Sequence, residues 1–283
     1  MKILSFGEII WDVYPEEKHI GGAPFNFAAH AKRAGAEAFL MSAVGNDTLG
    51  QEAIEKAESY GVNCEYVSVL NNISTGVCKV ELDEKGIPSY MIADNSAYDF
   101  IDLPSEMRQG FDALVFGTLA LRKSHNRAVV DELLREYCFR QVFVDINVRK
   151  PFDLSESILF ALERATFLKV SDEELPTVME RIGEAYLGID ESVKIIEKRF
   201  VNIEKVLVTR GAEPAVLYDL KTKDKYECQS KKTEVVSTVG AGDCYGAVFL
   251  SNYLSGKSID ICMKKSAEAA ALVVSYTEAI PSL

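Results

Sequence analysis

Short apolar segments alternate along this chain with longer segments in which apolar residues recur at helical spacing. The short segments predict strands, and the longer ones, of about 10–15 residues, predict helices between them. This alternation indicates βαβ units and a mostly parallel, covered sheet in an α/β fold. The expected strands are 2–6, 38–44, 113–116, 141–146, 166–170 and 205–209, and the expected helices are 24–32, 48–60, 125–138, 155–164, 171–181, 190–200, 242–254 and 258–276.

One stretch of the chain breaks the alternation. Three β-rich runs, 65–70, 75–82 and 88–91, follow one another without a helix, and residues 83–86 (Asp-Glu-Lys-Gly) predict a hairpin turn. Residues 9–14 have the same character. Together they predict a small β-sheet outside the main body, serving either as a lid over a site at the carboxyl edge of the main sheet or as a homodimer surface.

Composition and charge indicate the size of the domain and exclude some classes of binding partner. The chain has 283 residues, 48% hydrophobic and 26% charged, and residues 1–283 are expected to form one large domain. Its 43 acidic and 31 basic residues give a net charge of −12, which repels phosphate backbones and anionic lipids. Neither nucleic acid nor a membrane is therefore an expected partner. A local group of backbone N–H donors can still bind a small phosphorylated ligand.

The chain carries no targeting signal that we recognise. Glu8 interrupts the N-terminal apolar stretch before a signal-peptide core could form, and no apolar run is long enough to span a bilayer. The six cysteines have no CxxC spacing, so we expect reduced thiols and a cytoplasmic location.

Two glycine-containing segments resemble nucleotide-binding motifs only superficially. Residues 251–258 end like a P-loop, but the first glycine is missing and a predicted helix precedes them. Residues 240–246 have glycine spacing that differs from a dinucleotide fingerprint, and they lie far from the first strand. We therefore expect neither motif.

The segment Gly240, Ala241 and Gly242 points instead to an anion hole. It lacks bulky side chains and precedes a strongly helical run, so free N–H groups and the positive end of a helix dipole face one spot. Asp243 follows directly. It is either a helix N-cap or a general base that takes a hydroxyl proton while the N–H groups hold a phosphoryl group.

Several segments of this chain resemble the ribokinase/PfkB family of carbohydrate kinases. Residues 237–243 resemble its second signature. Residues 21–28, running on to 43–47, resemble its first, and the local sequence there is most similar to that of bacterial fructokinases. Agreement continues at 145–149, 168–175 and 208–212. The resemblance covers essentially the whole chain and implies a ribokinase-like sheet covered by helices on both faces, with a lid formed by about 9–20 and 65–92.

The resemblance also implies roles for residues on the sugar side. Asp243 would be the catalytic base, with Gly240 to Gly242 as the anion hole. Asp12 would accept hydrogen bonds from two sugar hydroxyls, or would be only a polar residue at a strand end. Gly22 would let the backbone approach the sugar. The Asn26 amide would bind a hydroxyl, its alternative being a first-turn helix residue.

Further roles concern the phosphates and the metal. Arg149 is a candidate cation for phosphate or substrate oxygen, or forms a surface ion pair. Thr209 and Gly211 correspond to nucleotide-binding positions, and Glu174 would order water around Mg²⁺, an ion that usually keeps several waters. ATP and Mg²⁺ are thus the implied cofactors.

Three positions depart from the family pattern. Ser171 replaces the usual Asn three residues before Glu174. Ser237 replaces an Asp that binds a monovalent cation in many members, and Glu278 lies close to a usual Gly in the other wall of that cation site.

The expected function is ATP-dependent phosphorylation of a small-molecule sugar, fructose or a similar ketose. The alternatives are a 2-keto-3-deoxygluconate kinase, a ribokinase, a nucleoside kinase, or a sugar-binding homologue with little turnover. A keto-acid substrate requires a cation, and the candidates are Arg122 and Arg149.

Overall fold

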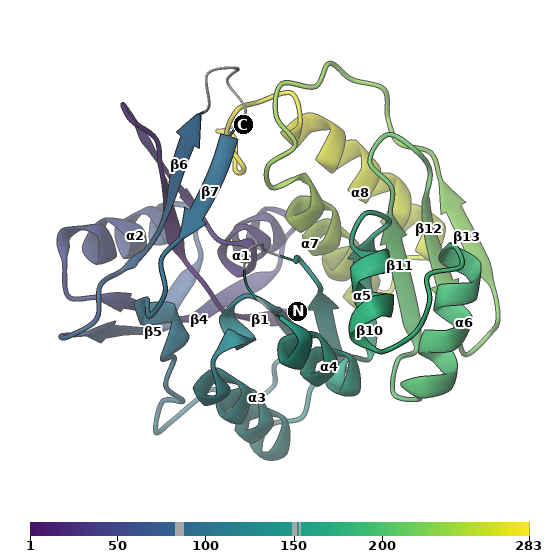
Figure 1. The fold of residues 1–283 in the computed structure, drawn as a ribbon, viewed down its shortest axis with the longest axis horizontal. Helices are drawn as coiled ribbons and strands as arrows, with labels where there is room; N and C mark the ends of the chain where they lie inside the picture. The colour runs from purple at the N-terminus through teal and green to yellow at the C-terminus, as the bar shows by residue number, and fades with distance from the viewer. Residues whose placement is uncertain (83–87, 149–151, 153, 283) are drawn as a thin grey trace.

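The computed structural model describes residues 1–82, 88–148, 152 and 154–282, with the backbone alone for 80–82 and 88–90. Within these residues, one sheet has the strand order β13-β12-β11-β10-β9-β8-β1-β4-β5 (Figure 1). Its strands are β1 (Lys2–Phe6), β4 (Glu37–Gly45), β5 (Asn63–Leu70), β8 (Ala113–Gly117), β9 (Gln141–Asp145), β10 (Phe167–Ser171), β11 (Lys205–Thr209), β12 (Ala215–Asp219) and β13 (Lys225–Cys228). The pairing is parallel from β5 to β11 and antiparallel for β12 and β13, which confirms a mostly parallel sheet.

Helices cover both faces of this sheet, as predicted (Figure 1). One face packs against α1 (Ala23–Arg33), α2 (Thr48–Ser59), α7 (Ala241–Leu254) and α8 (Ile259–Val273). The other packs against α3 (Ser124–Glu136), α4 (Ser155–Arg164), α5 (Leu175–Arg181) and α6 (Ile189–Arg199). Because both faces are covered, central strands such as β8 are buried at every position, which explains their continuous apolar sequences.

A second, smaller sheet has the strand order β3-β2-β6-β7. Its strands are β2 (Ile10–Val13), β3 (Lys18–Gly21), β6 (Gly76–Leu82) and β7 (Pro88–Ile92). The prediction that 65–70 belongs to this sheet is wrong, because β5 pairs in parallel with β4 at the edge of the main sheet. Helix α2 forms the crossover from β4 to β5, so this segment completes another βαβ unit. The predicted turn at 83–86 lies outside the described residues.

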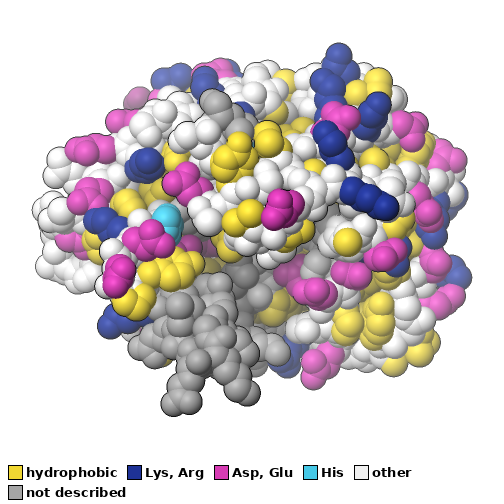
Figure 2. Space-filling model, turned by 90° about the horizontal axis from the view of Figure 1, so that it is seen from above, with side chains coloured by type: hydrophobic (Ala, Val, Ile, Leu, Met, Phe, Trp, Pro, Cys, Tyr) yellow, Lys and Arg dark blue, Asp and Glu magenta, His cyan; other side chains and the backbone are white. Residues whose placement is uncertain are grey.

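Other boundaries moved by a few residues. Helix α5 begins at Leu175 rather than 171, because Ser171 still belongs to β10. Helix α8 ends at Val273 rather than 276. The antiparallel edge strands β12 and β13 were not predicted. None of the helices in the described part of the chain is long and apolar enough to cross a bilayer. On the face seen in Figure 2, acidic side chains are spread widely and basic ones lie among them.

Candidate active site

The segment predicted to form an anion hole lies at the first turn of α7. Gly240 is the N-cap of α7 and has a φ of 77°, in the left-handed region that favours glycine. A Cβ at this position would lie 2.8 Å from the Cα of Ala279, so the close approach of the C-terminal segment also requires glycine. Gly240, Ala241 and Gly242 are half-exposed, whereas Asp243 is only 9% exposed. The turn is therefore partly open to solvent, and its Ala241 N–H donates to the Thr238 carbonyl at 3.3 Å.

Asp243, in the segment that resembles the second family signature, contacts Asn26, in the segment that resembles the first. The Asn26 side chain on α1 donates from Nδ2 to Asp243 Oδ2 at 2.8 Å, inside the packed interface of α1 and α7. Because Gly240 is the N-cap, the N-cap interpretation of Asp243 is not supported. Asn26 Oδ1 is buried and has no hydrogen-bond partner within the described part of the chain. Its acceptor capacity is therefore unused by the described part of the protein.

Asp12 and Gly22 lie on the small sheet and at its junction with α1. Asp12 pairs with His19 across β2 and β3, and its Oδ2 lies 2.7 Å from the position of a Cβ on Gly21. Gly22, the N-cap of α1, has a φ of 110°, and a Cβ there would lie 2.4 Å from the carbonyl oxygen of Glu8. Glycine therefore allows close backbone packing here, next to the half-buried carboxylate of Asp12.

The nucleotide-side candidates gather at the carboxyl ends of β10 and β11. Ser171 is in register with Thr209, and the Asp172 N–H donates to the Thr209 carbonyl at 2.9 Å. Gly211 follows with a φ of 55°. These strand ends lie at the same edge of the sheet, the usual ligand edge of an open α/β fold. Arg149, the remaining candidate, lies outside the described residues.

Ser171 holds Glu174 in place although it replaces the usual Asn. Its N–H and Oγ donate to Glu174 Oε2 at 3.0 and 2.8 Å, and the N–H of Val148 donates to Oε1 at 2.8 Å. A carboxylate has about four lone-pair sites, so Glu174 can still accept hydrogen bonds from metal-bound water. Across the described ranges, no group of three or more His, Cys, Asp or Glu side chains could hold a metal ion. The donor set at Glu174 fits Mg²⁺ held through water.

Sequence reasoning missed a buried ion pair beside this site. Lys169 in the middle of β10 donates to both carboxylate oxygens of Asp145, at 2.8 and 2.7 Å. Burial raises the pKa of Asp145 to about 6; Lys169 opposes this shift, and the carboxylates of Asp243 and Glu174 reinforce it. Burial alone would lower the pKa of Lys169, but Asp145 outweighs it and the net direction is upward. Both groups are therefore charged at neutral pH. A lysine between apolar residues of a strand signals a buried charge, although it does not identify the partner.

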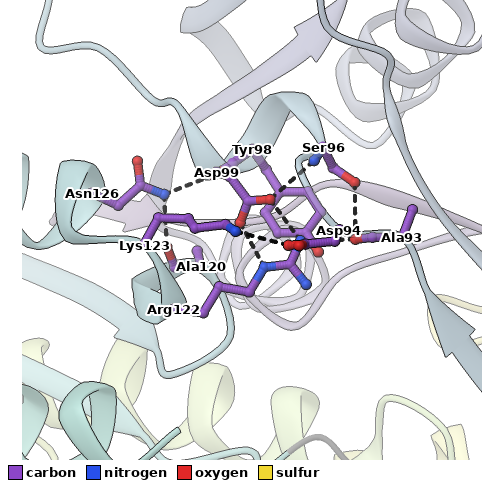
Figure 3. Close-up of polar contacts among 9 residues, drawn as sticks. All are labelled: Ala93, Asp94, Ser96, Tyr98, Asp99, Ala120, Arg122, Lys123 and Asn126. Carbon is purple, nitrogen blue, oxygen red and sulfur yellow. Dashed lines mark hydrogen bonds and ion pairs between the residues drawn. The ribbon is translucent and has the colours of Figure 1, made fainter. Parts of the chain in front are cut away.

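Arg122 does not provide an unneutralised cation for a keto-acid (Figure 3). Its Nε and Nη2 donate to the two carboxylate oxygens of Asp99, at 2.7 and 2.6 Å, and Nη2 also donates to the Ala93 carbonyl at 2.8 Å. The two side chains are 4% and 0% exposed. This pair links the 3₁₀ segments η1 (Ala97–Asp99) and η2 (Ala120–Arg122). Its position indicates that it stabilises the fold by holding these two segments together.

Comparison with known proteins identifies the class of kinase. A family model described as pfkB family carbohydrate kinase matches residues 3–283. The chain therefore belongs to the pfkB family of carbohydrate kinases, as the motifs predicted. Kinases of this family use ATP, with Mg²⁺ as the usual metal.

Relatives within the family differ in substrate. The 5-dehydro-2-deoxygluconokinase of Bacillus subtilis is 26% identical over 281 residues, which cover 94% of this chain and 84% of the relative. The fructokinase structure of Vibrio cholerae has a TM-score of 0.83 and 23% identity, covering 97% of this chain and 98% of that one. The ATP-bound fructokinase of Xylella fastidiosa has a TM-score of 0.83 and 19% identity, covering 99% and 94%.

Proposed function

We propose that this carbohydrate kinase transfers the terminal phosphoryl group of ATP to a hydroxyl of fructose or a similar ketose. The contact between Asn26 and Asp243 carries the proposal. Asn26 orients the carboxylate through Oδ2, which leaves the other carboxylate oxygen to accept the proton of the attacking hydroxyl. As that hydroxyl oxygen bonds to phosphorus, the proton passes to Asp243 and ADP leaves.

The first turn of α7 would stabilise the transferring group. The N–H groups of Gly240, Ala241 and Gly242 lie at the positive end of a 14-residue helix. Preorganised donors of this kind act where charge develops, and losing one typically costs a factor of about 10²–10³ in rate. The half-exposed glycines beside a buried Asp243 support this assignment.

The sugar would bind between α1 and the small sheet. Asp12 would accept from two hydroxyls, Gly22 would let the sugar approach the backbone, and Asn26 Oδ1 would accept from a further hydroxyl. We assign the small sheet, with residues 9–20, the role of a lid that excludes water from the transferring group. The same sheet is our candidate for a homodimer contact, which light scattering tests.

ATP would bind across the carboxyl ends of β10 and β11. Thr209 and Gly211 would contact its phosphates, and Glu174 would hold Mg²⁺ through water. When bound, the metal neutralises charge on the phosphates. We place the reaction in the cytoplasm, and the six free cysteines support a reducing compartment.

A sugar acid is the second candidate substrate, because curated relatives such as the Bacillus subtilis protein are 5-dehydro-2-deoxygluconokinases. A carboxylate on the substrate requires an unneutralised cation. Arg122 is paired with Asp99 inside the protein, which leaves Arg149 as the candidate cation for a sugar acid.

A substrate panel tests the proposal. ADP release would be measured with fructose, ribose, a nucleoside, 2-keto-3-deoxygluconate and 5-dehydro-2-deoxygluconate, with Asp243→Asn protein as the control for contaminating kinases. We expect the highest kcat/KM with fructose or another ketose. A higher kcat/KM with either acid would show that the substrate is a sugar acid rather than a ketose. Absence of sugar-dependent ADP release would contradict the proposed reaction.

A further inference from the structure

Lys169 lies directly behind the first turn of α7. A Cβ on Gly242 would lie 3.3 Å from Lys169 Nζ, so the ammonium borders the backbone of the proposed anion hole. The side chains of Lys169 and Asp145 are 6% and 9% exposed. An ammonium has three N–H donors, and the two contacts to Asp145 leave a third for another acceptor.

We propose that the Lys169 ammonium is the fixed positive charge that supports the anion hole from behind, and that Asp145 positions it there. The inference rests on the proposed anion hole at Gly240 to Gly242. Lys169 is a positioning residue in this scheme: it acts through the Gly242 backbone and has no assigned contact with substrate.

The balance of charge supports this role. Asp243 and Glu174 both interact electrostatically with Lys169 and Asp145. Without Lys169, an incoming phosphoryl group would meet the carboxylates of Asp145, Asp243 and Glu174 with no cation among them. A positive charge held at the base of the hole offsets part of that repulsion, and the buried surroundings keep water from screening it.

Fold stability alone does not explain this pair. Removing two charges from water is expensive, and well-packed apolar residues often serve a fold as well as a buried ion pair. A purely structural pair and an electrostatic support therefore predict different behaviour when both charges are removed together. If the pair is purely structural, a neutral double variant should regain both stability and activity. If Lys169 supports the anion hole electrostatically, the double variant should regain stability but not activity.

The experiment compares Lys169→Met, Lys169→Arg, and the double variant Lys169→Met/Asp145→Asn. The double variant Lys205→Met/Asp219→Asn is the matched control, since Lys205 and Asp219 form a second buried pair, at 3.1 Å, at the opposite end of β11 from Thr209. Melting temperature, kcat, sugar KM and calorimetric affinity for ADP, with and without aluminium fluoride, are measured for each protein. ADP with aluminium fluoride mimics the transferring phosphoryl group.

We expect Lys169→Met to be less stable than wild type and the double variant at 169 and 145 to regain much of that stability. In both proteins, kcat should fall on the order of 10²-fold, as for loss of an anion-hole donor, with sugar KM little changed. Aluminium fluoride should no longer tighten ADP binding as it does in wild type. Lys169→Arg should restore part of kcat, and the control double variant should keep kcat.

Recovery of both wild-type kcat and the aluminium fluoride effect in the double variant at 169 and 145 would overturn this inference. An equal loss of kcat in the control at 205 and 219 would overturn it too, since disturbance of the sheet would then explain both results. Failure of the proposed function is distinguishable, because the wild-type protein would then show no sugar-dependent ADP release.

Discussion

Asn26 and Asp243 are 217 residues apart in sequence, yet Asn26 Nδ2 donates to Asp243 Oδ2 at 2.8 Å. The first residue lies on α1 and the second in the first turn of α7, and these helices pack side by side on one face of the sheet. The contact joins the two segments that resemble the family signatures, 21–28 and 237–243, at a single carboxylate.

The first prediction concerns this carboxylate. Asp243→Asn keeps the shape of the side chain, and its amide oxygen can still accept from Asn26, but it cannot take a hydroxyl proton. Loss of a general base typically lowers the rate by about 10²–10⁴. We expect kcat to fall by that order while calorimetric affinities for ATP and sugar stay near wild type. Turnover within about threefold of wild type would exclude Asp243 as the base.

Asp12 allows a test of the sugar site that does not involve the base. Asp12→Ala removes a charged acceptor, and each hydrogen bond to a charged group contributes about 1.5–3 kcal/mol. Sugar affinity should therefore fall at least tenfold by calorimetry, with ATP affinity almost unchanged. Unaltered sugar affinity would remove Asp12 from the site.

The monovalent-cation prediction follows from Ser237 and Glu278. The Ser237 Oγ accepts from the Val239 N–H at 3.2 Å, and a hydroxyl supplies no charge to offset dehydration of a cation. The Glu278 side chain is exposed rather than directed inward. We expect nearly equal activity in K⁺, Na⁺ and a bulky organic cation at the same ionic strength. A severalfold, saturable activation by K⁺ over the organic cation would contradict this and would implicate Glu278 as a ligand.

His30 predicts how stability depends on pH. The residue is 3% exposed, and Nε2 lies 2.9 Å from the carbonyl oxygen of Ala279, the residue that packs against Gly240. Burial lowers the pKa of His30, although the contact with Ala279 and the charge of Asp243 oppose the shift. The unfolded chain therefore binds more protons than the folded one once the pH falls below about 6.5. The free energy of unfolding should decrease from that pH down through the folded pKa.

The matched variant for this effect is His30→Gln, which keeps an N–H donor for the Ala279 carbonyl but does not titrate. Its free energy of unfolding, measured with urea between about pH 7.5 and 5, should fall less steeply than that of wild type. The difference in slope cannot exceed about 1.4 kcal/mol per pH unit. Parallel curves for the two proteins would show that His30 does not contribute.

Local sequence patterns were enough to predict the α/β class and most of its elements, though not the edge strands β12 and β13. Apolar periodicity is a local property, so strands such as Lys2–Phe6 and Lys205–Thr209 and helices such as Ser155–Arg164 were predicted with correct or nearly correct bounds. The start of α7 directly after Gly240 could also be predicted, because the helix start and the conformation of Gly240 depend on a few neighbouring residues. A backbone conformation of this kind is determined by the sequence of a short segment.

Only the tertiary structure decided which distant residues meet. Whether 63–70 joins the small sheet or the main one depends on the crossover through α2, and the β-rich pattern is the same in both cases. A polar residue in a strand gives no indication of its partner, so the pairing of Lys169 with Asp145 and that of Arg122 with Asp99 were not predictable. Strand order and helix packing bring these groups together, and each charge then favours the charged form of its partner against the cost of burial.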